Sequence, residues 1–156
     1  MSDRPTPWQN FTGQYIAGAW RSGSTRKVLE NRNPYDNALL TELSLGDVSD
    51  LDDAYQAAAT AQKAWAQTLP NERSALFMRA VSVLEARHEE IVDWLIRESG
   101  STRTKAEIEW SAVRSTMITA AAMPSRVVGR ILPIDTPDKE SRVYRNPLGV
   151  VGVIRP

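Results

Sequence analysis

Few residues in this sequence have side chains that could carry out chemistry. The 156 residues include one histidine, His88, and no cysteine, so they contain no thiolate nucleophile, no disulfide and no cysteine metal site. His88 could act as a general acid or base, or as a metal ligand. A metal site needs partner ligands, however, and no second histidine or cysteine is present. Because His88 falls on the apolar stripe of a predicted helix, we interpret it as a structural residue.

Two carboxylates and two glycines form the remaining candidates. Glu107 and Glu109 could be a catalytic pair, but residues two apart lie on different faces of a helix; we interpret Glu107 as part of a helix cap. Gly149 and Gly152 have G-x-x-G spacing, but a phosphate-binding loop needs its glycines between a strand and a helix. These two lie inside an apolar run, where close backbone approach is the better explanation. The residues alone predict no catalytic site and no metal site.

Composition restricts the classes of partner. Hydrophobic residues make up 42% and charged residues 24% of the chain, with 19 basic and 19 acidic side chains and a formal net charge of zero. These values are typical of a globular protein. No basic stripe predicts binding to nucleic acid or to an anionic membrane. The polar first ten residues do not form a signal peptide, and no apolar run is long enough to span a membrane. We therefore expect a cytoplasmic protein.

Three long helices are predicted to position these residues. The first covers 48–69, with Ser49 as its cap, a solvated acidic start at 47–53, and Pro70 at its end. The second covers 71–97, with Asn71 as its cap and a break near residues 87 and 88. Gly100 follows it and suits a left-handed C-terminal position. The third opens with a capping box formed by Thr104 and Glu107 and continues to Pro124.

Extended segments surround the helices. A small hairpin is predicted around Gly18, a strand at 38–45, and a second hairpin from 127–132 and 141–145. The last part of the sequence is an apolar run of mostly β-branched residues: Val150, Val151, Val153 and Ile154. Without polar alternation, this run predicts a strand covered on both faces, as in parallel sheets. Since a parallel sheet needs further crossovers and strands, we expect the chain to be the front portion of a larger α/β protein.

A series of segments in order resembles the N-terminal part of the NAD(P)-dependent aldehyde dehydrogenase superfamily. The most specific segment is Arg145-Asn-Pro-Leu-Gly-Val-Val-Gly-Val-Ile-Arg-Pro156. The other segments cover nearly the whole chain: Tyr15-Ile-Ala-Gly-Ala-Trp20, Asn33-Pro-Tyr35, the alanine-rich stretch 52–65, Glu72-Arg73, Glu98-Ser-Gly100 and Gly129-Arg-Ile-Leu-Pro133.

The resemblance implies an α/β fold, specifically an incomplete aldehyde dehydrogenase-like fold. Residues 1–128 would form the N-terminal hairpin and helices of the cofactor-binding domain. Residues 129–147 would form a protruding β-hairpin through which subunits associate, which implies a homo-oligomer. Residues 148–156 would form the first strand of the Rossmann-type sheet.

The resemblance also implies a reaction, the oxidation of an aldehyde to a carboxylate with NAD or NADP. A cysteine thiolate attacks the aldehyde, hydride passes to NAD(P)+, and the thioester is hydrolysed. In the family, the cysteine, the glutamate base and the oxyanion-hole asparagine follow the region that this chain matches. No catalytic residue is therefore assigned here, and we expect the chain alone to be inactive.

Only supporting roles transfer from the family to individual positions. Ile154, Arg155 and Pro156 match the strand end that lies against the adenosine ribose of the cofactor, mostly through backbone contacts. Met117 and Ala121 match a helix that helps to wall the substrate tunnel. Ser101-Thr-Arg103, where many members have lysine after the glycine, resembles bacterial benzaldehyde and vanillin dehydrogenases.

Two alternatives to an enzyme fragment with a missing catalytic region remain open. The chain could be a truncated, non-catalytic protein that associates with full-length subunits through its hairpin. It could also be a partial sequence of an intact enzyme.

Overall fold

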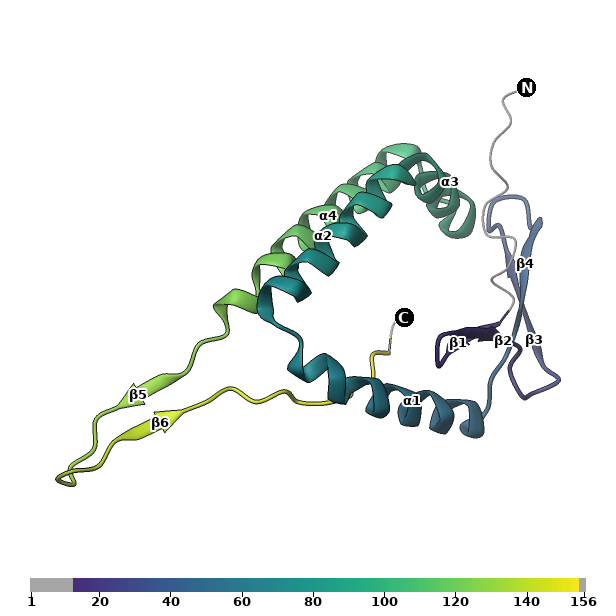
Figure 1. Ribbon diagram of the computed structural model, residues 1–156. Coiled ribbons are helices and arrows are strands. Elements are labelled where there is room, and N and C mark those ends of the chain that lie inside the picture. Colours follow the sequence, from purple (N-terminus) through teal and green to yellow (C-terminus); the bar gives the residue numbers. More distant parts are fainter. Residues whose placement is uncertain (1–12, 155–156) are drawn as a thin grey trace.

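The computed structural model describes residues 13–154 and shows three small hairpins arranged around four helices (Figure 1). Strands β1 (Gln14–Ile16) and β2 (Ala19–Arg21) pair antiparallel. Their turn places Ala17 and Gly18 at φ 53° and 84°, a pair of positive values that suits a tight hairpin. Strands β3 (Val28–Arg32) and β4 (Leu39–Ser44) form the second pair. The first hairpin and the strand at 38–45 were predicted, whereas β3 was not.

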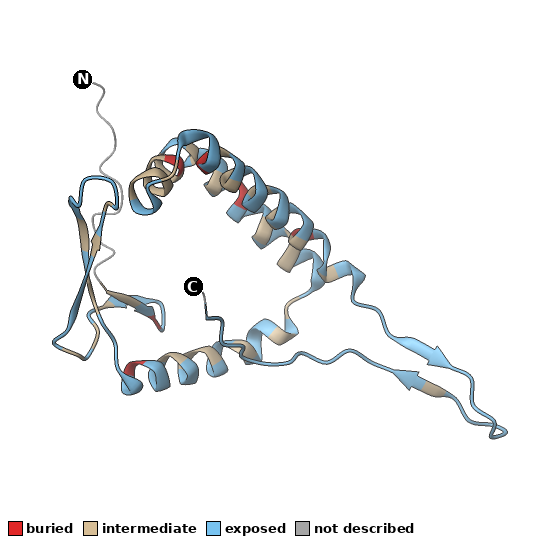
Figure 2. Cartoon of the chain, turned by 180° about the vertical axis from the view of Figure 1, so that it is seen from behind, coloured by how far each residue is buried: buried red, intermediate tan, exposed pale blue. Residues whose placement is uncertain are grey.

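The helices are α1 (Val48–Gln67), α2 (Pro70–Ala86), α3 (His88–Ser99) and α4 (Arg103–Ala122), followed by a short 3₁₀ turn, Pro124–Arg126. Helices α2 and α4 lie side by side, and α3 packs on the far end of α4, while α1 lies apart from them (Figure 1). The buried apolar side chains are few and lie mainly in this helical layer (Figure 2): Ile16, Val81, Val92, Ala106 and Ala121. None of the described helices is long and apolar enough to cross a membrane.

The cap of α1 is Asp47, and the prediction of Ser49 as the cap is wrong. The Asp47 carboxylate accepts hydrogen bonds from the backbone N–H groups of Ser49, at 2.8 Å, and of Asp50, at 3.2 Å. A residue just before the first helical turn can reach these free N–H groups with its side chain. Ser49 is already inside the helix, and its hydroxyl donates to Asp47 instead, at 2.7 Å.

Pro70 both follows α1 and begins α2, so Asn71 is not the cap that the sequence analysis proposed. The missing N–H of a proline costs nothing at the first position of a helix. The corner is held by Arg73, whose guanidinium donates to the carbonyl oxygens of Thr68, at 3.0 Å, and Ala66, at 3.2 Å. These carbonyls lie at the end of α1, where no helical N–H is available to them.

The predicted break near residues 87 and 88 is confirmed, because Arg87 leaves helical geometry between α2 and α3. The prediction for Gly100 is also confirmed, with φ 65° in the left-handed region. The capping box of Thr104 and Glu107 is wrong. Helix α4 is capped by Thr102, whose hydroxyl accepts from the backbone N–H of Lys105 at 3.3 Å.

The last hairpin, β5 (Arg130–Leu132) with β6 (Ser141–Val143), projects away from the helices (Figure 1). Residues 144–154 then run back toward α1 without forming a strand (Figure 1). Leu148 is 95% exposed and Ile154 98%, so no described element covers this segment, and its assignment as the first strand of a larger sheet stays a prediction. The described strands form three separate two-stranded sheets, and this segment pairs with none of them.

Candidate functional site

The C-terminal segment 148–154 is extended and belongs to no described helix or strand. Within the described part of the chain, no backbone hydrogen bond involves these residues. Gly149 turns the segment with φ 95°. A Cβ at residue 152 would collide with the hydroxyl oxygen of Tyr55. The expectation that glycine permits close backbone approach is confirmed at Gly152.

The end of this segment is the part that the family resemblance predicts to contact a nicotinamide cofactor. In open α/β sheets, ligands bind beyond the carboxyl ends of the strands. Ile154, at that end, is 98% exposed, while Arg155 and Pro156 lie outside the described residues. The exposed end of this segment leaves room for a main-chain contact with the cofactor, and that contact stays a prediction.

Met117 and Ala121 lie one turn apart on the same face of α4. Ala121 is 6% exposed and is enclosed by the packing of this helix. Met117 is half-buried and keeps accessible surface. Of the two residues proposed to wall a substrate tunnel, Met117 therefore offers more surface to a ligand.

Helices α3 and α4 bring His88 and Glu107 together, which the sequence analysis did not predict. Nε2 of His88 lies 2.7 Å from Oε2 of Glu107, and Nδ1 lies 3.2 Å from Oε1 of Glu89. The imidazole also meets Trp110 edge-on, with ring centroids 4.4 Å apart. Glu109 turns elsewhere and pairs with Lys105 at 2.7 Å. The expectation that Glu107 and Glu109 do not converge is thus confirmed.

His88, Glu89 and Glu107 also form a candidate cation site, because one ligand atom from each lies within 4.8 Å of the others. The guanidinium group of Arg103 already pairs with the carboxylates of Glu89 and Glu107. Arg103 donates to both oxygens of Glu89 at 2.8 Å and lies 3.0 Å from Oε1 of Glu107. Hydrogen bonding to Arg103 lowers the pKa of Glu89. A metal ion would have to displace Arg103, so the arrangement is an ion-pair cluster that joins α3 to α4.

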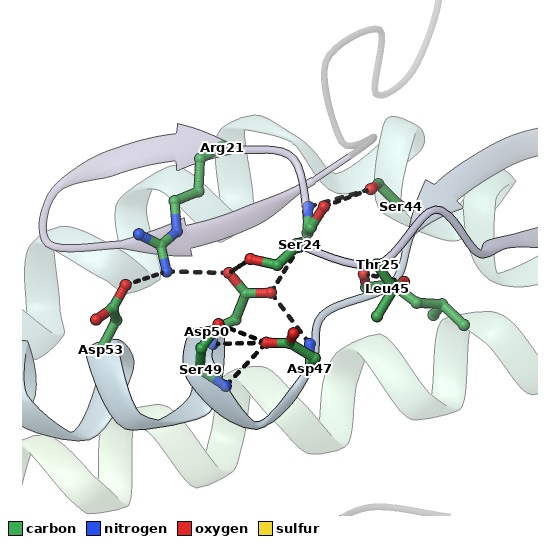
Figure 3. A network of polar contacts seen from close by, with 10 residues as sticks. Arg21, Ser24, Thr25, Ser44, Leu45, Asp47, Ser49, Asp50 and Asp53 are labelled. Atoms are coloured by element: carbon green, nitrogen blue, oxygen red, sulfur yellow. Dashed lines mark hydrogen bonds and ion pairs between the residues drawn. The ribbon is translucent and has the colours of Figure 1, made fainter.

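A second polar network fastens the first hairpin to α1 (Figure 3). The carboxylate of Asp50 is buried and accepts from the Ser24 N–H at 2.7 Å, the Ser24 hydroxyl at 2.9 Å, the Asp47 N–H at 3.1 Å and Arg21 at 3.1 Å. The Ser24 backbone bond makes the largest contribution to lowering the pKa of Asp50. Arg21 also bridges to Asp53 at 2.8 Å. The interpretation of residues 47–53 as a wholly solvated helix start is wrong at Asp50.

Comparison with known proteins places this architecture in a family. The sequence profile of the aldehyde dehydrogenase family matches residues 20–156. The chain belongs to the aldehyde dehydrogenase family. Its fold matches a crystal structure of an NAD-dependent benzaldehyde dehydrogenase from Corynebacterium glutamicum with a TM-score of 0.83 and 45% identity, over 86% of this chain and 29% of that one. The predicted family and fold class are both confirmed.

The similar curated proteins include two that are named for aromatic aldehydes. A vanillin dehydrogenase from Corynebacterium glutamicum is 48% identical over 93% of this chain and 30% of its own length. A benzaldehyde dehydrogenase from Bacillus subtilis is 40% identical over 96% of this chain and 31% of its own length. The chain thus spans about 30% of the length of these aldehyde dehydrogenases.

Proposed function

We propose that these residues serve the NAD(P)+-dependent oxidation of an aromatic aldehyde to a carboxylate, as the N-terminal part of an aldehyde dehydrogenase. The observation that carries the proposal is the 48% identity to a vanillin dehydrogenase over 93% of the chain. The benzaldehyde dehydrogenase at 40% identity supports the same substrate class. A thiolate enzyme that uses a nicotinamide cofactor suits the reducing cytoplasm, which is the compartment we propose.

The chain contributes binding and positioning, and no nucleophile. When bound, NAD(P)+ supplies the hydride acceptor. The free main chain of residues 150–154 would face the adenosine ribose, together with Arg155 and Pro156. Met117 and Ala121 would belong to the wall of the aldehyde tunnel. With no cysteine in its 156 residues, the chain cannot form the thiohemiacetal from which hydride departs, so we expect it to be inactive alone.

Two enzyme assays test this proposal. The purified 156-residue chain, supplied with benzaldehyde or vanillin and either NAD+ or NADP+, should produce no reduced cofactor. The same residues, joined to the C-terminal remainder of the Corynebacterium glutamicum vanillin dehydrogenase, should oxidise both aromatic aldehydes with higher kcat/KM than acetaldehyde. Turnover by the chain alone would contradict the predicted inactivity. A soluble but inactive joined protein, or one that prefers acetaldehyde, would contradict the proposed role.

The exposed apolar side chains of the last hairpin favour a second function, subunit association. Ile131 is 71% exposed and Tyr144 70%, although isoleucine is among the residue types most often buried and tyrosine is intermediate. We propose that residues 129–147 join subunits, either copies of this protein or intact relatives. Size-exclusion chromatography of the chain mixed with an intact relative should show a mixed oligomer. The double variant Ile131→Ser/Tyr144→Ser should abolish it, and separate elution of the unmodified chains would contradict this function.

A further inference from the structure

The last hairpin carries its charges in two separate groups. Its tip, residues 135–140, has three acidic side chains and one basic one: Asp135, Asp138, Lys139 and Glu140. Its stem, residues 127–134 and 141–147, has three arginines and no acidic residue: Arg130, Arg142 and Arg145. The hairpin projects from the helices (Figure 1), and of residues 127–147 all but Ser141 are exposed. A partner would therefore meet the tip and the stem as surfaces of opposite sign.

The two strands of this hairpin differ in the edges that they offer. β5 is followed directly by Pro133, and a proline lacks the N–H group that a neighbouring strand needs. β6 has no proline between Pro137 and Pro147. In the described part of the chain, β5 and β6 pair only with each other, which leaves the outer edge of β6 unpaired. An unpaired edge of this kind can accept a further strand.

The sequence of β6 is complementary to itself when two copies run antiparallel. With Ser141 of each copy opposite Ser141 of the other, Glu140 of each copy lies opposite Arg142 of the other. Opposite charges in facing positions stabilise a strand pair, and like charges destabilise it. Centring the pair on Arg142 would set two arginines opposite each other. Centring it on Val143 would give neither Glu140 nor Arg142 a facing charge of opposite sign. The register centred on Ser141 also brings the acidic tip of each copy beside the basic stem of the other.

The ion pair inside one copy leaves both side chains able to make this contact. Arg142 donates to Glu140 at 2.9 Å through Nε and at 2.6 Å through a terminal nitrogen, and both bonds end on the same oxygen, Oε2. Glu140 and Arg142 keep 46% and 58% of their side-chain surface exposed. The second carboxylate oxygen of Glu140 can thus accept from an arginine of another copy.

We propose that two copies of this protein associate through the free edge of β6, antiparallel and centred on Ser141, to form a four-stranded sheet in the order β5–β6–β6–β5. This inference rests on the subunit association proposed for residues 129–147, and it specifies the partner, the strand and the register. A two-fold interface uses the same surface of both copies. The self-complementary order of charges on β6 satisfies that requirement.

Charge-reversed variants test the contact between copies. The unmodified chain should sediment as a dimer that 1 M salt weakens. Glu140→Arg makes positions 140 and 142 both positive, and Arg142→Glu makes both negative. Each variant alone should raise the dissociation constant of the dimer by on the order of tenfold. An equimolar mixture of the two should form a mixed dimer as stable as the unmodified one, since every facing pair again has opposite signs. Neither variant regains the ion pair within its own chain, so this recovery reports contact between copies.

Arg130→Glu is the matched control, because it reverses an exposed charge on β5, which lies away from the second copy in the proposed sheet. This variant should dimerise as the unmodified chain does. A monomeric unmodified chain, equal weakening by Arg130→Glu, or no preference for the mixed dimer would overturn the inference. A monomeric chain that still joins an intact relative would contradict the self-pairing alone. A dimer that shows the expected charge dependence but joins no relative would support the self-pairing and contradict mixed association.

Discussion

Replacing Gly100 with alanine should destabilise the protein through two separable effects. Gly100 ends α3 in the left-handed region, at φ 65°. A Cβ there would lie 2.8 Å from Cγ of Pro34, in the turn between β3 and β4. The substitution thus forces both an unfavourable backbone conformation and a collision with a rigid ring.

The size of each effect can be worked out separately. An L-residue with a side chain pays about 1–2 kcal/mol in the left-handed region. Overpacking by one methyl group typically costs about 1–3 kcal/mol when the neighbour cannot move freely, and the proline ring is such a neighbour. Gly100→Ala should therefore lower the free energy of unfolding by about 2–5 kcal/mol.

Gly18→Ala provides the comparison that isolates the backbone effect. Gly18 has φ 84°, and nothing lies within 4 Å of the position of its Cβ. Urea unfolding, followed by circular dichroism, should give a loss of only about 1–2 kcal/mol for this variant. Pro34→Ala combined with Gly100→Ala should recover part of the larger loss. Equal losses for the two glycine variants, or no recovery with Pro34→Ala, would refute the collision.

Three further predictions concern the buried contacts and the ion pairs. Asp50→Asn should destabilise the chain at pH 7 more than the exposed Asp52→Asn does. Because the pKa of Asp50 is lowered in the folded chain, its contribution is complete above the unfolded value of about 3.9 and is lost as the pH falls through the folded value. In urea unfolding, the free energies of unfolding of the Asp50→Asn and Asp52→Asn variants should therefore become similar at low pH. Val92→Ala, at a site with 0% exposure, should cost about 2 kcal/mol, whereas Val83→Ala, at 56% exposure, should cost much less. Arg103→Met should lower the melting temperature in dilute buffer, by an amount that shrinks in 1 M salt, where the Debye length is about 3 Å.

The sequence predicts the elements of this fold best where a constraint is local to a few residues. The left-handed end of α3 follows from Gly100, and the break between α2 and α3 was predicted at residues 87 and 88. Pro70 and Pro124 likewise predict where α1 and α4 end, since each proline lies a few residues beyond the end of its helix. In each case, the backbone geometry of one residue type limits the alternatives.

Helix caps were predicted two residues too late because several side chains compete for the same N–H groups. Asp47 and Ser49 are both good caps by type, as are Thr102 and Thr104. The residue that caps is the one whose side-chain oxygen reaches an N–H group two or three residues ahead in the folded helix, and these residues are Asp47 and Thr102. Residue type limits the candidates for a helix cap, and the backbone geometry of the folded helix decides which candidate forms the hydrogen bond.

The polar clusters could not be predicted, because their members come from distant parts of the chain. The buried carboxylate of Asp50 accepts hydrogen bonds from Arg21, at the end of β2, and from Ser24, in the loop after it. His88 meets Glu107 across two helices. A charge pattern along the sequence does not distinguish such residues from solvated ones. The burial of the Asp50 carboxylate in the folded chain is what distinguishes it from its solvated neighbours.

The apolar run at 150–154 shows that a hydrophobic pattern can predict burial that the rest of the described chain does not provide. Its residues predict cover on both faces, yet Val153 and Ile154 are almost fully exposed among the described residues. A covered strand is a property of its neighbours, since sheet pairing and burial both require other elements. The pattern therefore specifies an environment that residues 13–149 do not supply. Within those residues, the segment has partial cover only at Val150, which is 37% exposed, and the remaining cover that the pattern predicts requires further strands.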